Sequence, residues 1–121
     1  MANPMQVLED VRGFMKSRII LSAAELDLFT LIDRGADTVE ALCRQTGSDS
    51  RGLTRLLDAT VAYELMAKEN DRYRLTDAGR LLSADNPKRN LTMVRKMNEL
   101  CDDWSRITET VKAGKKKKKT N

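Results

Sequence analysis

Apolar side chains recur at steps of three and four residues over most of the chain, which is the spacing of one face of an α-helix. The first series follows Pro4, a residue favoured at the start of helices, and its members are Val7, Leu8, Val11, Phe14, Met15 and Ile19. A second series ends near Gly35 and is apolar around much of the helix; its members are Ala23, Ala24, Leu26, Leu28, Phe29, Leu31 and Ile32. The pattern predicts an amphipathic first helix followed by a deeply buried one.

Two short helices are expected next. Thr38 is a typical N-cap residue, and it precedes a predicted helix over 39–46 that Gly47 ends. Asp49 or Ser50 caps the following helix, whose apolar stripe is formed by Leu53, Leu56, Leu57, Val61 and Leu65. Two short helices joined by a glycine and a polar cap predict a helix-turn-helix.

The spacing then changes from helical to alternating. Tyr73 and Leu75 alternate with two arginines, as in a strand with one buried face. Asn70 and Asp71 form a two-residue turn signal between this strand and the preceding one, so we predict a hairpin over 67–75.

A short helix is predicted after the hairpin. Thr76 caps it, we expect it to run through Leu82, and Gly79 would allow it to approach the strands closely. A helix-turn-helix followed by a hairpin is the order of a winged helix. The predicted fold class is therefore mainly α: a winged helix with an N-terminal dimerisation helix and a long C-terminal helix.

The last predicted helix follows a loop at Asn86 and Pro87 and ends at Gly114. Its apolar stripe is formed by Leu91, Val94, Met97, Cys101, Trp104, Ile107 and Val111, with Leu100 beside it. We expect three segments: a winged-helix domain over 1–85, a linker helix over 86–114 and an unfolded lysine-rich tail over 115–121.

The net charge of +4 comes from the tail. Lys115–Lys119 supply five of the 22 basic residues, which leaves 17 against 18 acidic residues in the rest of the chain. The predicted recognition helix carries Arg51 and Arg55, but Asp49 and Asp58 offset them. Because phosphate affinity grows with the number of neutralising cations, specific binding to nucleic acid is not expected.

Residues with catalytic or metal-binding chemistry are scarce. The chain has no histidine, which removes the commonest general base and transition-metal ligand. Cys43 and Cys101 stand far apart at apolar helical positions, so we expect buried, inert thiols. No signal peptide and no apolar run long enough for a bilayer are recognisable, which predicts a cytoplasmic protein without a membrane partner.

Several motifs occur in an order that resembles one known family. The stretch GFMKSRIILSAAELDLF over 13–29 is similar to its "GF..SR.L..AAELGLF", and GLTRLLDA over 52–59 is similar to its "L.RLLRAL". LTDAG over 75–79 and the segment from Trp104 to Gly114, similar to "W..L...V.TG", follow in the same order. The chain thus resembles the N-terminal dimerisation domain of S-adenosylmethionine-dependent O-methyltransferases.

The resemblance implies a homodimer whose helices interlock across a two-fold axis. The expected interface consists of Val7, Val11, Phe14, Met15 and Ile19, with an intramolecular core role as the alternative. Met15 and Trp104 are candidates for a wall of the substrate pocket, although for Trp104 we first expect a role as the anchor of the last helix.

The resemblance also implies that the full-length parent transfers a methyl group from S-adenosylmethionine to a small hydroxylated substrate. The Gly-rich turn that would hold this cofactor is not recognisable, because the six glycines are scattered without a G-x-G spacing. We expect this chain alone to mediate assembly, with no catalytic, cofactor-binding or metal-ligating residue. The lysine run stands where a catalytic domain would continue, so we expect a truncated chain.

Two other functions are considered. A winged-helix transcription regulator would bind DNA in a salt-sensitive way even without the lysine tail. An interaction adaptor would bind another protein through the last helix, and Trp104→Ala would abolish that binding without affecting the dimer.

Overall fold

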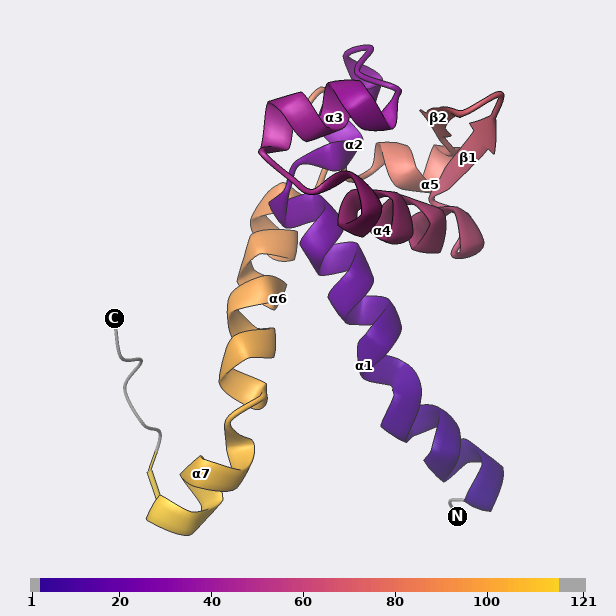
Figure 1. Ribbon diagram of the computed structural model, residues 1–121. Helices are drawn as coiled ribbons and strands as arrows, with labels where there is room; N and C mark the ends of the chain where they lie inside the picture. Colours follow the sequence, from indigo (N-terminus) through magenta and orange to yellow (C-terminus); the bar gives the residue numbers. More distant parts are fainter. Residues whose placement is uncertain (1–2, 116–121) are drawn as a thin grey trace.

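The computed structural model describes residues 3–115, which form seven helices and two strands (Figure 1). The helices and strands are α1 (Pro4–Glu25), α2 (Leu28–Asp33), α3 (Val39–Thr46), α4 (Ser50–Ala62), β1 (Met66–Glu69), β2 (Arg72–Leu75), α5 (Asp77–Arg80), α6 (Leu91–Trp104) and α7 (Ile107–Ala113). A mainly helical chain with a helix-turn-helix and one hairpin confirms the predicted winged-helix class. The predicted lysine tail lies outside the described residues from Lys116 onward.

Local side-chain caps explain where the helix-turn-helix begins and turns. The Thr38 hydroxyl accepts the backbone N–H of Ala41 at 3.2 Å and starts α3. Gly47 ends α3 with a φ of 70°, a left-handed conformation that favours glycine. Asp49 then accepts the N–H of Gly52 at 2.9 Å and starts α4. The predicted caps of both helices are confirmed.

The hairpin has the predicted turn and begins one residue earlier than predicted, at Met66. β1 and β2 are antiparallel, with Met66 opposite Leu75. Asn70 and Asp71 both have a positive φ, as the commonest two-residue hairpin turn requires. Along β2, Tyr73 and Leu75 are buried and the two arginines are exposed, which confirms the alternation predicted from the sequence.

One apolar core holds the winged-helix body together. α2 lies inside it, since three of its four apolar residues are buried, as predicted for the second apolar series. The core residues are Ala23, Leu28, Phe29, Ile32, Leu42, Leu53, Leu57, Met66, Tyr73 and Leu75. Tyr73 and Phe29 are the largest of the fully buried side chains.

The boundary between the first two helices differs from the prediction. Ala23 and Ala24 belong to the end of α1, and the chain turns at Asp27, which adopts φ 60° and ψ 30°. Apolar spacing alone could not locate this break, because neither glycine nor proline marks it and aspartate enters the left-handed region less readily than glycine.

The predicted long C-terminal helix is two helices. α6 ends at Trp104 and α7 begins at Ile107. Arg106 stands between them, and its guanidinium contacts the carboxylates of Asp102 at 3.3 Å and Asp103 at 3.1 Å. The helix after the hairpin is also shorter than predicted, since α5 ends at Arg80 rather than at Leu82.

Two helical arms leave the winged-helix body in different directions (Figure 1). One is the N-terminal part of α1, and the other is α6 followed by α7. The two arms approach each other where they join the body and diverge toward their ends. Every residue from 3 to 17 is exposed, and among them Lys16 reaches the body, with its Nζ 5.3 Å from the centre of the Tyr63 ring.

Both cysteines are less buried than predicted. Cys43 and Cys101 are free thiols of intermediate exposure. Cys43 packs against the core from α3, whereas Cys101 lies on α6 outside the core cluster. Within residues 3–115, the helices lack the combination of length and apolar character that crossing a bilayer requires.

Candidate functional site

The exposed half of α1 carries the predicted dimer stripe. Phe14 is 67% exposed and Val11 is 65% exposed, values that are unusual for large apolar side chains. The exposed large apolar residues of this arm are Met5, Val7, Leu8, Val11, Phe14 and Met15. An intramolecular core role is therefore wrong for these side chains. Ile19, the last residue of the predicted interface, is half-buried where α1 reaches the body.

The second arm exposes a further apolar surface. The apolar series predicted for this region divides between two faces of α6: Leu91, Val94 and Cys101 are half-buried, whereas Met97 and Trp104 are exposed. The exposed large apolar residues of α6 and α7 are Met93, Met97, Trp104, Ile107 and Val111. We call the exposed apolar residues of both arms the arm surface.

Trp104 lies at the break between α6 and α7. It is 65% exposed and borders an open hollow of about 290 Å³, lined also by Leu100, Asp103, Ile107 and Thr110. The expectation that Trp104 anchors the last helix is wrong, because an anchoring side chain would be buried against the body. An exposed indole beside an apolar hollow is instead available to a molecule from outside the chain.

Arg18 joins the two arms where they leave the body. Its guanidinium Nη2 donates to Oδ1 of Asn98 on α6 at 2.7 Å, and Nη1 lies 3.7 Å from Sγ of Cys101. Within α1, Nε donates to Ser22 at 3.2 Å and Nη2 lies 3.6 Å from the Glu25 carboxylate. Sequence spacing could not predict this contact, because Arg18 and Asn98 are 80 residues apart.

Above this joint, the apolar sides of α1 and α6 face a cleft of about 440 Å³. Leu21 and Ala24 line it from α1, and Leu91 and Val94 line it from α6. Charged residues at the rim include Glu25, Asp27, Arg95 and Glu99. The cleft between the two arms is thus partly apolar and partly charged, and Asn98, which accepts the Arg18 hydrogen bond, also lines it.

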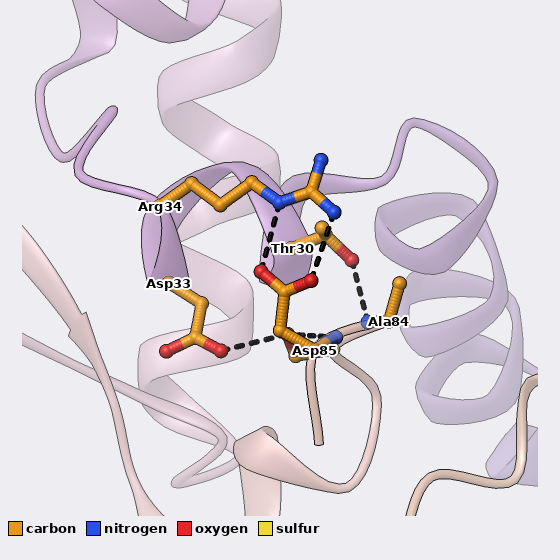
Figure 2. Close-up of polar contacts among 6 residues, drawn as sticks. Thr30, Asp33, Arg34, Ala84 and Asp85 are labelled. Atoms are coloured by element: carbon orange, nitrogen blue, oxygen red, sulfur yellow. Dashed lines mark hydrogen bonds and ion pairs between the residues drawn. The ribbon is translucent and has the colours of Figure 1, made fainter. Parts of the chain in front are cut away.

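Three polar contacts fasten the segment before α6 to α2 (Figure 2). The Arg34 guanidinium forms two hydrogen bonds of 2.8 Å with the Asp85 carboxylate, and the hydroxyl of buried Ser83 donates to Asp33 at 2.8 Å. The backbone N–H of Ala84 donates to the Thr30 hydroxyl at 2.8 Å. The Arg34 guanidinium lowers the pKa of the Asp85 carboxyl below its ordinary value.

Two cations of the wing pair with carboxylates of the helical body. The Tyr73 hydroxyl donates to Asp58 on α4 at 2.7 Å, and Lys68 contacts the same carboxylate at 3.4 Å. Burial is the main cause of the raised pKa of Tyr73, followed by its hydrogen bond to Asp58. Arg72 is paired with Asp37 at 3.0 Å. These pairs leave fewer free cations for a phosphate backbone.

The glycines occupy positions that do not form a cofactor turn. Gly35, Gly47 and Gly114 have a positive φ at helix ends, and Gly13 and Gly52 lie inside helices. Gly79 packs against the backbone of Leu65, as its predicted role in close approach requires. These residues do not fit the Gly-rich strand-to-helix turn that a nucleotide-like methyl donor requires. Among the described residues, His, Cys, Asp and Glu do not gather in a group that could hold a metal ion.

A winged-helix body with two arms that expose apolar side chains has the features of an assembly domain, and comparison with known proteins agrees. The family model of the O-methyltransferase dimerisation domain matches residues 8–85. The chain belongs to this family. The resemblance seen in the sequence motifs is thereby confirmed.

Curated relatives of the chain are methyltransferases. It is 35% identical over 116 residues to the tetracenomycin polyketide synthesis 8-O-methyl transferase TcmO of Streptomyces glaucescens. This match covers 93% of the chain and 34% of the relative. It is 28% identical over 120 residues to the acetylserotonin O-methyltransferase of Gallus gallus, covering 93% of the chain and 35% of the relative. The chain therefore spans about a third of the length of the curated relatives it matches.

Solved structures share the fold. The pyocyanin biosynthetic protein PhzM is 30% identical with a TM-score of 0.76, over 91% of this chain and 34% of that protein. Human N-acetylserotonin methyltransferase, solved in complex with SAM, is 24% identical with a TM-score of 0.78, over 94% of this chain and 36% of that protein. The matched relatives also include a phenazine-1-carboxylate N-methyltransferase of Pseudomonas aeruginosa. The matched relatives thus include enzymes named as O-methyltransferases and one named as an N-methyltransferase.

Proposed function

We propose that the chain pairs with a second copy of itself through the stripe formed by Val7, Val11, Phe14, Met15 and Ile19. The observation that carries this proposal is the exposure of the first four of these side chains on an arm that extends away from the body. A contiguous apolar surface of this kind is unfavourable in water and marks an interaction site. A second copy supplies the same stripe, so a two-fold arrangement covers both surfaces at once.

The exposed side of α6 takes part in the same interface. Met93 and Met97 are exposed on α6, and their flexible side chains adapt well to an irregular partner surface. α1 and α6 leave the body from one joint, so a second copy that covers α1 near this joint also reaches α6. The pairing surface proposed here therefore comprises the α1 stripe with Met93 and Met97.

In a full-length methyltransferase, this pairing would bring two active sites into one assembly. S-adenosylmethionine would be held outside residues 3–115, since the glycines of this chain do not fit its binding turn. We propose transfer of a methyl group to a small hydroxylated molecule, with Met15 and Trp104 at the substrate pocket. The hollow beside Trp104 supports this role. Free, separated cysteines are in keeping with the predicted cytoplasmic location.

The test of the pairing surface is a charge placed in its centre. Phe14→Asp puts a carboxylate where the second copy must pack and should convert the dimer into a folded monomer, because an unpaired charge in an apolar interface is strongly unfavourable. The circular dichroism of the body should not change, since Phe14 is 67% exposed.

Gly13→Asp is the matched control. It introduces the same charge at the neighbouring position, on a different face of α1, and a Cβ there meets nothing within 4 Å. Sedimentation velocity should show a dimer for Gly13→Asp and a monomer for Phe14→Asp. A Phe14→Asp variant that dimerises with unchanged affinity would exclude this stripe as the interface.

A further inference from the structure

Arg18 occupies the point at which the burial of α1 changes. All residues from 3 to 17 are exposed, and from Arg18 to Ala24 all are half-buried or buried. On α6, the partners of Arg18 are Asn98 and Cys101. The guanidinium therefore forms the polar contact that closes the joint before the two arms separate.

The chemistry of this joint restricts the angle between the arms. A guanidinium is planar and its donors point in fixed directions, so hydrogen bonds from it constrain orientation more than apolar contacts do. Nη2 and Nη1 reach Asn98 and Cys101 on α6, while Nε is held by Ser22 on α1. The side chain is thus bound to both helices at once.

Glu25 adds a charge to the same network. Its carboxylate lies 3.6 Å from Nη2 of Arg18, which is itself 40% exposed. Solvent screens such a pair, so its contribution to the stability of the chain is small. Its geometric effect is different: together with Ser22, it holds the Arg18 side chain from α1, while Asn98 and Cys101 hold it from α6.

We propose that Arg18 is a positioning residue that sets the spread of α1 relative to α6 and thereby preorganises the pairing surface. This inference rests on the proposed pairing function. A second copy must contact α1 and α6 together, so an arm that moves freely has to be ordered during association. Fixing the arm in advance removes that cost, which is how preorganisation strengthens binding.

The test separates arm geometry from affinity. Glu9 on α1 and Lys96 on α6 are exposed, and each can be replaced by a non-canonical amino acid that carries a paramagnetic label without use of the native cysteines. The two labels report the distribution of distances between α1 and α6. Mixing labelled chain with excess unlabelled chain keeps the measurement within one copy. The wild type should give one narrow distribution, and Arg18→Met should broaden it.

Pairing should weaken in the same variant. Arg18→Met should raise the dimer dissociation constant about tenfold, the effect expected when a charge-assisted hydrogen bond that organises an interface is lost. Arg18→Lys should restore part of both properties, since an ammonium reaches one α6 partner without the planar fork. Arg12→Met is the matched control: Arg12 is exposed on the same helix and makes no polar contact within residues 3–115.

The outcomes distinguish this inference from the proposed function. A wild-type chain that is monomeric at all concentrations contradicts the pairing function, while the label distances still test the joint. A dimer whose affinity and distance distribution are unchanged in Arg18→Met overturns the positioning role. A broadened distribution with unchanged affinity also overturns it, because the joint would then not serve pairing. If Arg18→Met fails to fold, Asn98→Ala tests the same contact from α6.

Discussion

The backbone carbonyl of Leu65 occupies the space that a side chain at position 79 would need. A Cβ built on Gly79 would overlap the Leu65 oxygen, far inside van der Waals contact. Leu65 directly precedes β1, and Gly79 lies in α5, so the contact fixes the short helix against the base of the wing. The same carbonyl accepts the N–H of Thr76 at 3.2 Å.

Replacing this glycine should therefore destabilise the body. Gly79→Ala forces the backbone of α5 away from Leu65 and should lower the free energy of unfolding by about 1–3 kcal/mol, the usual cost of overpacking. Urea denaturation followed by circular dichroism measures the loss. Gly52→Ala is the control: its Cβ would make only an ordinary 3.6 Å contact with Asp49, so the gain in helix propensity should leave stability equal or higher. Equal stabilities of Gly79→Ala and wild type would refute the wing contact.

Acid should weaken the connection between α2 and the segment before α6. The Arg34 guanidinium lowers the pKa of the Asp85 carboxyl below its ordinary value of 3.8, mainly through their hydrogen bonds. A carboxyl whose folded-state pKa is lowered stabilises the fold above its unfolded pKa, and this contribution is lost as pH falls through the lowered value.

Asp85→Asn should consequently be less stable than the wild type at neutral pH, and the difference should shrink below about pH 4. Thermal unfolding between pH 2 and pH 7 measures this dependence. Asp71→Asn, at an exposed turn position, is the control and should show no such convergence. A difference between Asp85→Asn and wild type that is constant with pH would contradict a role for the charged pair.

Asp27 should be replaceable by glycine with a gain in stability. Its φ of 60° lies in the left-handed region, which costs a residue with a side chain roughly 1–2 kcal/mol. Glycine avoids this cost but loses roughly 0.5–1 kcal/mol more in backbone entropy on folding. Asp27→Gly should raise the melting temperature by a few degrees, whereas Asp27→Ala should lower it. A lower melting temperature for Asp27→Gly would show that the aspartate side chain stabilises the turn between α1 and α2.

Trp104 should remain exposed in the dimer if it faces a substrate rather than the second copy. It is the only tryptophan, so its fluorescence reports this site alone. The emission maximum should stay that of a hydrated indole at every protein concentration, and Trp104→Ala should leave the dimer dissociation constant within about threefold of wild type, as is usual for residues outside a hot spot. A blue shift that grows with protein concentration would instead place Trp104 in the pairing interface.

The parts of the fold that depend on local chemistry could be predicted from the sequence. Thr38 and Asp49 cap helices because their side-chain oxygens bond backbone N–H groups three residues later. Asn70 and Asp71 form the hairpin turn because both accept a positive φ. The exposed stripe of α1 follows from its spacing, although only the structure shows that the body leaves it uncovered.

The features that sequence reasoning missed depend on distant contacts or on unmarked breaks. Arg18 meets Asn98, and Arg34 meets Asp85, across 80 and 51 residues. The turn at Asp27 and the break before Ile107 carry no glycine or proline, so a continuous apolar pattern concealed them. Of the candidate site, the apolar stripe on the first helix could be recognised from its spacing, whereas the Arg18 joint and the exposure of Met93 could not.

The solution mass of the chain across a wide range of concentrations tests the central claim most directly. Sedimentation equilibrium should give about twice the chain mass of 13.7 kDa, with dissociation only at high dilution. Phe14→Asp should sediment at the mass of one chain under the same conditions. A well-folded wild-type chain that remains at 13.7 kDa even at high concentration would contradict pairing through α1.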